Sequence, residues 1–166
     1  GDAAVLVAPG DIEALAGGVD ILDIKEPANG SLGMATTTVI NEIADAVHRQ
    51  TRPIPVSVAL GELHNWTNQA DAPSLPANVT FAKVGLSGLR GQPNWQRSWQ
   101  SFRQRCEDRR QQSIKWVAVA YADALQASSP RLPEVLQVTM PKKRARSTST
   151  NQMRLRRSSV MSVAPR

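Results

Sequence analysis

A lysine close to a carboxylate is the arrangement in this sequence best suited to covalent chemistry. Lys25 follows Asp23 by two residues, at the end of an apolar run and just before a turn rich in proline and glycine. A lysine amine that is held beside a carboxylate and partly removed from water can attack a carbonyl carbon and form a Schiff base. The alternative is an exposed ion pair at a strand end, because paired charges also occur in purely structural networks.

The residues before Lys25 predict the element that would position it. Residues 19–24 are short, largely β-branched and apolar, and they lie between a glycine pair and Pro27, which favours a strand. Side chains two residues apart on a strand share a face. Asp23 and Lys25 are therefore expected on one face, with Leu22 and Ile24 on the other.

Strands and helices alternate along the rest of the chain. Thr37 or Thr38 can cap a helix with an apolar face, and Asn94 can cap a second one. The pattern predicts strands at 4–8, 54–60, 80–86 and 115–121, and helices at 11–16, 37–48, 95–106 and 133–138. This alternation is typical of an α/β fold with a parallel sheet.

Two α/β architectures compete, an open doubly wound sheet and a (β/α)8 barrel of the TIM type. No GxGxxG motif follows the first predicted strand, as a dinucleotide-binding doubly wound fold would require. Lys25, Lys83 and Asp123 each lie at or near the C-terminal end of a predicted strand, where barrels place their active sites. The barrel is therefore favoured, with residues 1–138 supplying about five βα units.

The net charge of +6 is concentrated at the C-terminal end of the sequence. Residues 142–166 contain eight Lys or Arg and no acid, so residues 1–141 have 12 basic against 14 acidic residues and a net charge of −2. Nucleic-acid binding by the folded part is therefore not expected. The alternative is a non-catalytic protein whose basic tail binds polyanions.

Cysteine content and hydropathy indicate the cellular compartment, and the spacing of the histidines bears on metal binding. The single Cys106 excludes an internal disulfide framework and fits a reducing compartment. Neither a secretory signal nor an apolar run of membrane-spanning length is visible, so a cytoplasmic protein without membrane contact is expected. His48 and His64 have no second ligand at metal spacing, so no metal site is expected.

Three segments together resemble one enzyme family. They are GGVDILDIKEPANGSLG at 17–33, FAKVGLSGL at 81–89 and VAVAYADAL at 117–125. The sequence resembles the (5-formylfuran-3-yl)methyl phosphate synthases of methanofuran biosynthesis, which are (β/α)8 barrels. The similarity runs from about Val5 to about Val138.

The resemblance implies a lyase that condenses two molecules of glyceraldehyde 3-phosphate into a phosphorylated furan aldehyde, with loss of one phosphate and of water. The substrate is thus a small phosphorylated aldehyde, and no cofactor is implied. Lys25 matches the Schiff-base lysine of the family, Lys83 the lysine that moves protons, and Asp23 the acidic partner of the first lysine. An iminium at Lys25 would act as an electron sink and acidify the neighbouring carbon.

Further residues are candidates for substrate binding. The turn formed by Gly30, Ser31 and Gly33 can cradle a phosphate with backbone amides, although a turn that needs glycine conformations explains it equally well. Asp123 either faces the same site or caps the segment that follows.

The sequence departs from the family after residue 138. A closed barrel needs eight units, and residues 139–166 have no acid, no aromatic residue and no helical or strand period, so we expect a truncated member with a disordered tail. The edge of the fifth strand would then be exposed and would favour homo-oligomers or aggregation. An inactive barrel fragment is accordingly a second alternative.

Overall fold

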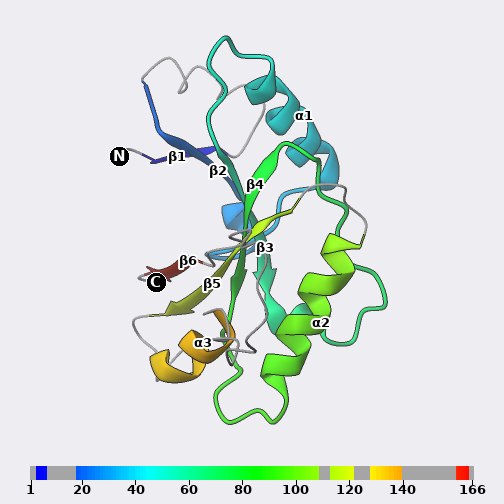
Figure 1. Ribbon diagram of the computed structural model, residues 1–166, viewed down its shortest axis with the longest axis vertical. Helices are drawn as coiled ribbons and strands as arrows, with labels where there is room; N and C mark the ends of the chain where they lie inside the picture. The colour runs from blue at the N-terminus through cyan, green and yellow to red at the C-terminus, as the bar shows by residue number, and fades with distance from the viewer. Residues whose placement is uncertain (1–2, 7–17, 109–112, 122–127, 140–159, 165–166) are drawn as a thin grey trace, which may run out of the picture.

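The computed structural model describes residues 3–6, 18–108, 113–121, 128–139 and 160–164. Within these residues, six strands form one parallel sheet and three α-helices pack around it (Figure 1). The strands are β1 (Ala3–Leu6), β2 (Ile21–Ile24), β3 (Val56–Glu62), β4 (Val79–Gly85), β5 (Lys115–Tyr121) and β6 (Val160–Ala164). The helices are α1 (Thr37–His48), α2 (Trp95–Glu107) and α3 (Leu132–Thr139), with short 3-10 helices η2 (Pro27–Asn29) and η3 (Leu63–Trp66). The predicted α/β fold is confirmed.

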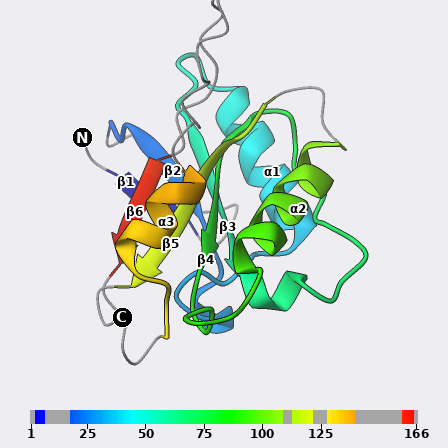
Figure 2. The same cartoon turned by 60° about the horizontal axis from the view of Figure 1, so that its bottom comes forward.

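The strand order follows the chain, since each strand pairs with the next from β1 to β6. Every connection therefore steps in the same direction, and right-handed crossovers then place the helices on one face. Figures 1 and 2 show α1 and α2 together on one side of the sheet. A doubly wound sheet reverses its strand order at a switch point, which this sheet does not do over β1 to β6. Closure into an eight-stranded barrel stays a prediction.

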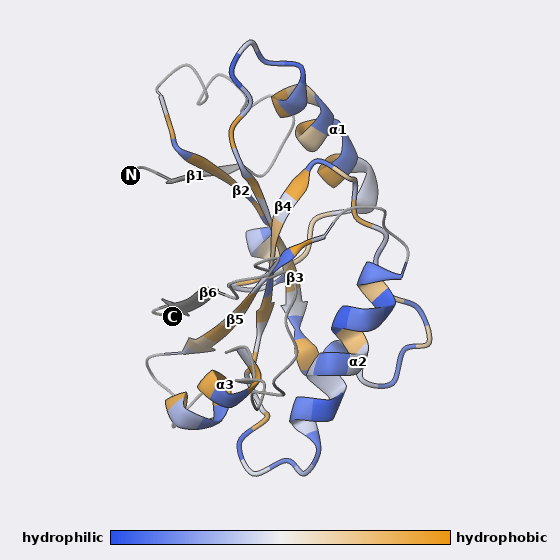
Figure 3. Ribbon diagram, in the orientation of Figure 1, coloured by the Kyte–Doolittle hydropathy of each residue, from blue (hydrophilic) through white to orange (hydrophobic). Residues whose placement is uncertain are grey.

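The helix-covered face of the sheet is apolar. We define it by the alternate strand residues that the helices bury: Leu22, Ile24, Val56, Val58, Leu60, Ala82, Val84, Trp116, Ala118 and Ala120. The apolar face predicted for the helix at 37–48 is confirmed, since α1 buries Ile40, Ile43, Ala44 and Val47 against this face. Figure 3 shows the same division, with apolar strands and helices whose outer sides are hydrophilic.

Helix α2 contributes the aromatic part of this core. Phe102 stacks on Trp66 with ring centroids 5.3 Å apart and meets the edge of Trp116 at 5.9 Å. Trp99 also meets Trp116 edge-on, at 6.0 Å. Trp95, Trp99 and Phe102, which lie at helical spacing on α2, are thus core residues.

Both predicted helix caps need correction. Thr36, rather than Thr37 or Thr38, caps α1, because its hydroxyl accepts a hydrogen bond from the Val39 amide at 3.3 Å, the third residue of the helix. Asn94 does precede α2, but its backbone is left-handed, with φ of 67°, and its side chain makes no capping hydrogen bond. A side-chain cap normally needs an extended backbone at that position.

The opposite face of the sheet, here called the site face, combines apolar and charged residues. Its apolar part is a small cluster of Ala59, Val117, Val119 and Tyr121 from β3 and β5, packed with Leu32 and Phe81. Asp23, Ser57 and Lys83 lie among these strand positions, and Asp23 and Ser57 are buried. The predicted alternation along β2 therefore separates Asp23 from the helix-covered face.

The C-terminal segment differs from its prediction. Val160–Ala164 forms β6 and pairs in parallel with Val117–Tyr121 of β5, so the prediction that residues 139–166 contain no strand is wrong for these five residues. Strand β6 also covers the edge of β5 that was expected to be exposed. The sequence did not predict β6 because this strand forms by pairing with a segment far away in the chain, and the basic composition around it does not reveal that pairing. The predicted helix at 11–16 lies outside the described residues.

Candidate active site

A charged pair crosses the site face between β2 and β4. The Lys83 ammonium donates a hydrogen bond to Asp23 Oδ2 and forms an ion pair with it. The pair spans the intervening strand β3, where Ser57 lies beside Asp23 and Ala59 beside Lys83. The two side chains are 13% (Asp23) and 20% (Lys83) exposed. Asp23 was expected to be the partner of Lys25, whereas among the described residues it pairs with Lys83.

The second oxygen of Asp23 is an open acceptor. Asp23 Oδ1 is buried and has no hydrogen-bond partner among the described residues. A buried, unpaired carboxylate oxygen costs free energy unless some group donates to it. The site therefore offers one acceptor for a donor that the described part of the chain does not supply.

Lys25 differs from Lys83 in its surroundings. It comes directly after Ile24, the last residue of β2, and its side chain is half-buried. Within the described ranges, no residue forms a salt bridge or a side-chain hydrogen bond with Lys25. Lys83 is therefore tied to a carboxylate, whereas Lys25 has no such partner among the described residues.

The turn after Lys25 contains two positions that require glycine. Gly30 has φ of 106°, which favours glycine, and a side chain at Gly33 would place its Cβ 2.1 Å from Glu26 O. The Gly30 amide donates to Pro27 O at 3.1 Å, and the Gly33 amide donates to Gly30 O at 3.0 Å. The amides of these two glycines are therefore used to close the turn.

Two other amides of the same turn remain open. In the described part of the chain, the backbone N–H groups of Ser31 and Leu32 have no acceptor. Leu32 O accepts from the Gly61 amide at 2.8 Å, and the Leu32 side chain packs into the apolar cluster of the site face. The turn is thus fastened to β3 while it keeps two adjacent donors, an arrangement that suits an anion.

Two residues that the sequence analysis did not select also lie at this end of the sheet. Tyr121, the last residue of β5, donates its hydroxyl proton to Glu62, the last residue of β3. Tyr121 Oη is also 3.3 Å from Ser31 Oγ in the turn. A glutamate and a tyrosine that end otherwise apolar strands were the only sequence signal for this arrangement.

Some of the remaining candidates lie outside the described residues, and the others make no contact with the site face in the described part of the chain. Asp123 lies outside the described residues, as do the basic residues 142–157 of the tail. Over the described ranges, no three His, Cys, Asp or Glu side chains are grouped to hold a metal ion. His64, an exposed residue of the 3-10 helix η3, has its Nδ1 atom 3.2 Å from Ser87 O. None of the described helices has the length and apolar character needed to cross a membrane.

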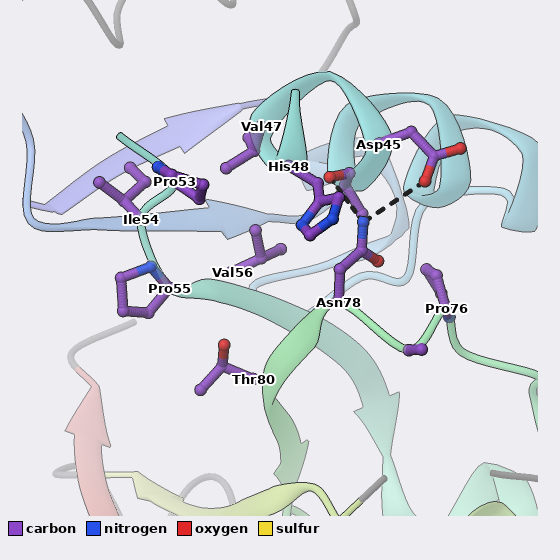
Figure 4. Close-up of a pocket in the computed structure, with 12 residues that line it drawn as sticks. Asp45, Val47, His48, Pro53, Ile54, Pro55, Val56, Pro76, Asn78 and Thr80 are labelled. Atoms are coloured by element: carbon purple, nitrogen blue, oxygen red, sulfur yellow. Dashed lines mark hydrogen bonds between the residues drawn. The ribbon is translucent and has the colours of Figure 1, made fainter. Parts of the chain in front are cut away.

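A pocket of about 580 Å³ lies at the opposite end of the sheet (Figure 4). It is lined by the C-terminal part of α1 and by the segments that lead into β3 and β4: Ala44, Asp45, Val47, His48, Pro53, Ile54, Pro55, Val56, Pro76, Ala77, Asn78 and Thr80. Asn78 closes one wall by donating to Ala44 O at 2.8 Å. None of the predicted site residues that the structure describes lines this pocket, because they lie toward the C-terminal ends of the strands.

Comparison with known proteins gives consistent matches. The sequence profile of the family described as 4-HFC-P synthase matches residues 6–146. A (5-formylfuran-3-yl)methyl phosphate synthase of Methanococcus maripaludis is 33% identical over 127 residues, which are 72% of this chain and 52% of that protein. The synthase of Archaeoglobus fulgidus is 38% identical over 82 residues, 48% of this chain and 34% of that protein. The chain spans about half or less of the length of these relatives.

Proposed function

The chain belongs to the 4-HFC-P synthase family, and from this we propose that its site face carries the Schiff-base chemistry of a (5-formylfuran-3-yl)methyl phosphate synthase. The reaction would join two molecules of glyceraldehyde 3-phosphate into the furan aldehyde phosphate and release one phosphate and two molecules of water. The fold that would hold this site is a (β/α)8 barrel, to which this chain contributes the strands β1 to β6.

Lys25 is the proposed nucleophile. Its unpaired amine would add to the aldehyde carbon of the first substrate, and loss of water would leave an iminium. The iminium would draw electrons from the adjacent carbon, so that a proton can leave there and the phosphate on the third carbon can be eliminated with the electron pair of its C–O bond. The support for this role is that Lys25 is half-buried and makes no ion pair with a described residue.

Lys83 and Asp23 are the proposed proton-transfer pair. Lys83 is tied to Asp23 Oδ2, while Asp23 Oδ1 is free to accept a proton or a hydrogen bond from the substrate. A carboxylate that pairs with a lysine orients its ammonium as a proton donor. The observation that carries the proposal is this contrast between Lys83 on β4, which is paired with Asp23, and Lys25 just after β2, which has no partner among the described residues.

The turn formed by Gly30, Ser31 and Gly33 is the proposed site of the substrate phosphate. It follows Lys25 closely in sequence, and the open amides of Ser31 and Leu32 are suitable donors for a phosphate oxygen. A phosphate held there would fix the aldehyde end of a three-carbon substrate relative to Lys25.

Borohydride trapping tests the proposal. Reduction in the presence of glyceraldehyde 3-phosphate is expected to convert the iminium into a stable secondary amine and to increase the mass of the intact chain. The Lys25→Ala variant is expected to lose this adduct, whereas Lys115→Ala, which removes an exposed lysine at the start of β5, is expected to keep it. Equal labelling of Lys25→Ala and the unsubstituted chain would refute the role of Lys25.

A further inference from the structure

A chain of hydrogen bonds connects two strands with the turn that follows Lys25. Tyr121 at the end of β5 donates to Glu62 Oε1 at the end of β3. A tyrosine hydroxyl has one proton, so Ser31 must be the donor in its 3.3 Å contact with Tyr121 Oη. The order of donation is therefore Ser31 to Tyr121 to Glu62.

Glu62 is held in place at the far end of this chain. Its Oε2 accepts a hydrogen bond from the Ser87 amide at 2.9 Å, so both carboxylate oxygens have donors. Glu62 lies opposite Gly85 in the register of β3 and β4, and a Cβ at Gly85 would be 2.2 Å from Glu62 Oε2. The carboxylate thus occupies the space that a side chain at Gly85 would take, and it joins β3, β4 and β5.

The packing of Tyr121 indicates why it carries a hydroxyl. Its ring is 2% exposed and belongs to the apolar cluster with Leu32 and Val119, where a phenylalanine would fill the same space. The Tyr121 hydroxyl and the half-buried Glu62 carboxylate cost free energy unless they are hydrogen-bonded, so apolar side chains at these positions would satisfy packing without that cost. The chain of hydrogen bonds from Glu62 through Tyr121 ends on Ser31. Ser31 is exposed, and its backbone amide is one of the two donors of the turn that have no described acceptor.

We propose that Tyr121 and Glu62 are positioning residues that hold the turn at Ser31 in its anion-binding shape and thereby select phosphorylated over unphosphorylated aldehydes. This inference rests on the proposed function in assigning the substrate phosphate to the turn. Donors that are already oriented avoid the cost of ordering a loop when the anion binds. Loss of the contact to Ser31 is expected to weaken phosphate binding by about tenfold, the effect of one hydrogen bond.

Titration with inorganic phosphate, followed by phosphorus NMR, measures this effect without the Schiff base. The dissociation constant is expected to rise about tenfold in Tyr121→Phe and similarly in Ser31→Ala. The matched control is Thr80→Val, which removes a half-buried hydroxyl at the other end of the sheet and is expected to leave phosphate binding unchanged. Equal affinity in the unsubstituted chain and Tyr121→Phe would overturn the inference, as would absence of phosphate binding.

Trapping with unphosphorylated glyceraldehyde separates positioning from general loss of structure. If Tyr121 positions the turn, Tyr121→Phe is expected to leave the half-saturating concentration of glyceraldehyde within about twofold of the unsubstituted chain. If Tyr121 only stabilises the fold, trapping and phosphate binding would fall together, which would overturn the inference. A selective loss of phosphate affinity in a chain that borohydride never labels would support the positioning role and refute the proposed Schiff-base function.

Discussion

The two faces of the sheet are formed by the same strands but differ in how many polar residues they hold. The helix-covered face buries Trp99, Phe102 and Trp116 in an apolar core beneath α1 and α2. The site face holds a smaller apolar cluster interrupted by the Asp23–Lys83 pair and by Glu62. Stability is therefore expected to depend mainly on the first face, while the second face retains polar groups that packing alone does not require.

The largest expected effect concerns the helix-covered face. Phe102→Ala should lower the free energy of unfolding by about 3–5 kcal/mol, because a fully buried ring with two aromatic neighbours is lost. Urea unfolding measures this change. Phe81→Ala, which truncates a half-buried ring on the site face, is the matched control and should cost clearly less. A greater cost for Phe81→Ala would reverse the proposed division between the faces.

A smaller loss is expected when the charged pair is broken. Lys83→Met should lower the free energy of unfolding by about 3 kcal/mol, because the buried Asp23 carboxylate then lacks its counter-charge. Lys25→Met removes a lysine without a described partner and should change stability by less than about 0.5 kcal/mol. The two variants are compared by urea unfolding at one pH. Similar losses in both would show that Lys25 is also engaged in an ion pair.

The smallest expected effect concerns the close approach of Glu62 to β4. Gly85→Ala should cost about 1–2 kcal/mol, because the new methyl group forces the Glu62 carboxylate away from its donors. In the double variant with Glu62→Ala, most of the added cost of the methyl group should disappear. The coupling free energy from the four unfolding measurements quantifies this contact. A coupling near zero would mean that Glu62 does not occupy the space beside Gly85.

Local patterns predicted much of the fold because they depend on neighbours in sequence. The apolar stripe of α1 and the bounds of β5 follow directly from periodicity and apolar runs. The capping residue Thr36 was missed by one position, since three consecutive threonines offer equivalent caps. Strand β6 was missed because its partner β5 lies about forty residues away in sequence, beyond any local signal.

The sequence supplied candidate site residues but not the contacts between them. Asp23 was selected from its spacing beside Lys25, and Lys83 from its place near a strand end, yet the pairing of Asp23 with Lys83 depends on the register of both strands against β3. The same limit applies to Glu62 and Tyr121, which lie 59 residues apart in sequence and meet only when β3 and β5 are placed on either side of β4. The sequence alone identifies side chains that can react, whereas the order and register of the strands determine which of them are paired.

Peptide mapping after borohydride reduction tests the central claim most directly. This claim is that Lys25, which has no partner among the described residues, forms the iminium, and that Lys83, which is paired with Asp23, does not. The chain is reduced with glyceraldehyde 3-phosphate, digested, and the adduct is located by tandem mass spectrometry. The adduct is expected on Lys25, with Lys83 unlabelled while Asp23 holds its ammonium. An adduct on Lys83, or equal labelling of exposed lysines such as Lys115, would contradict the claim.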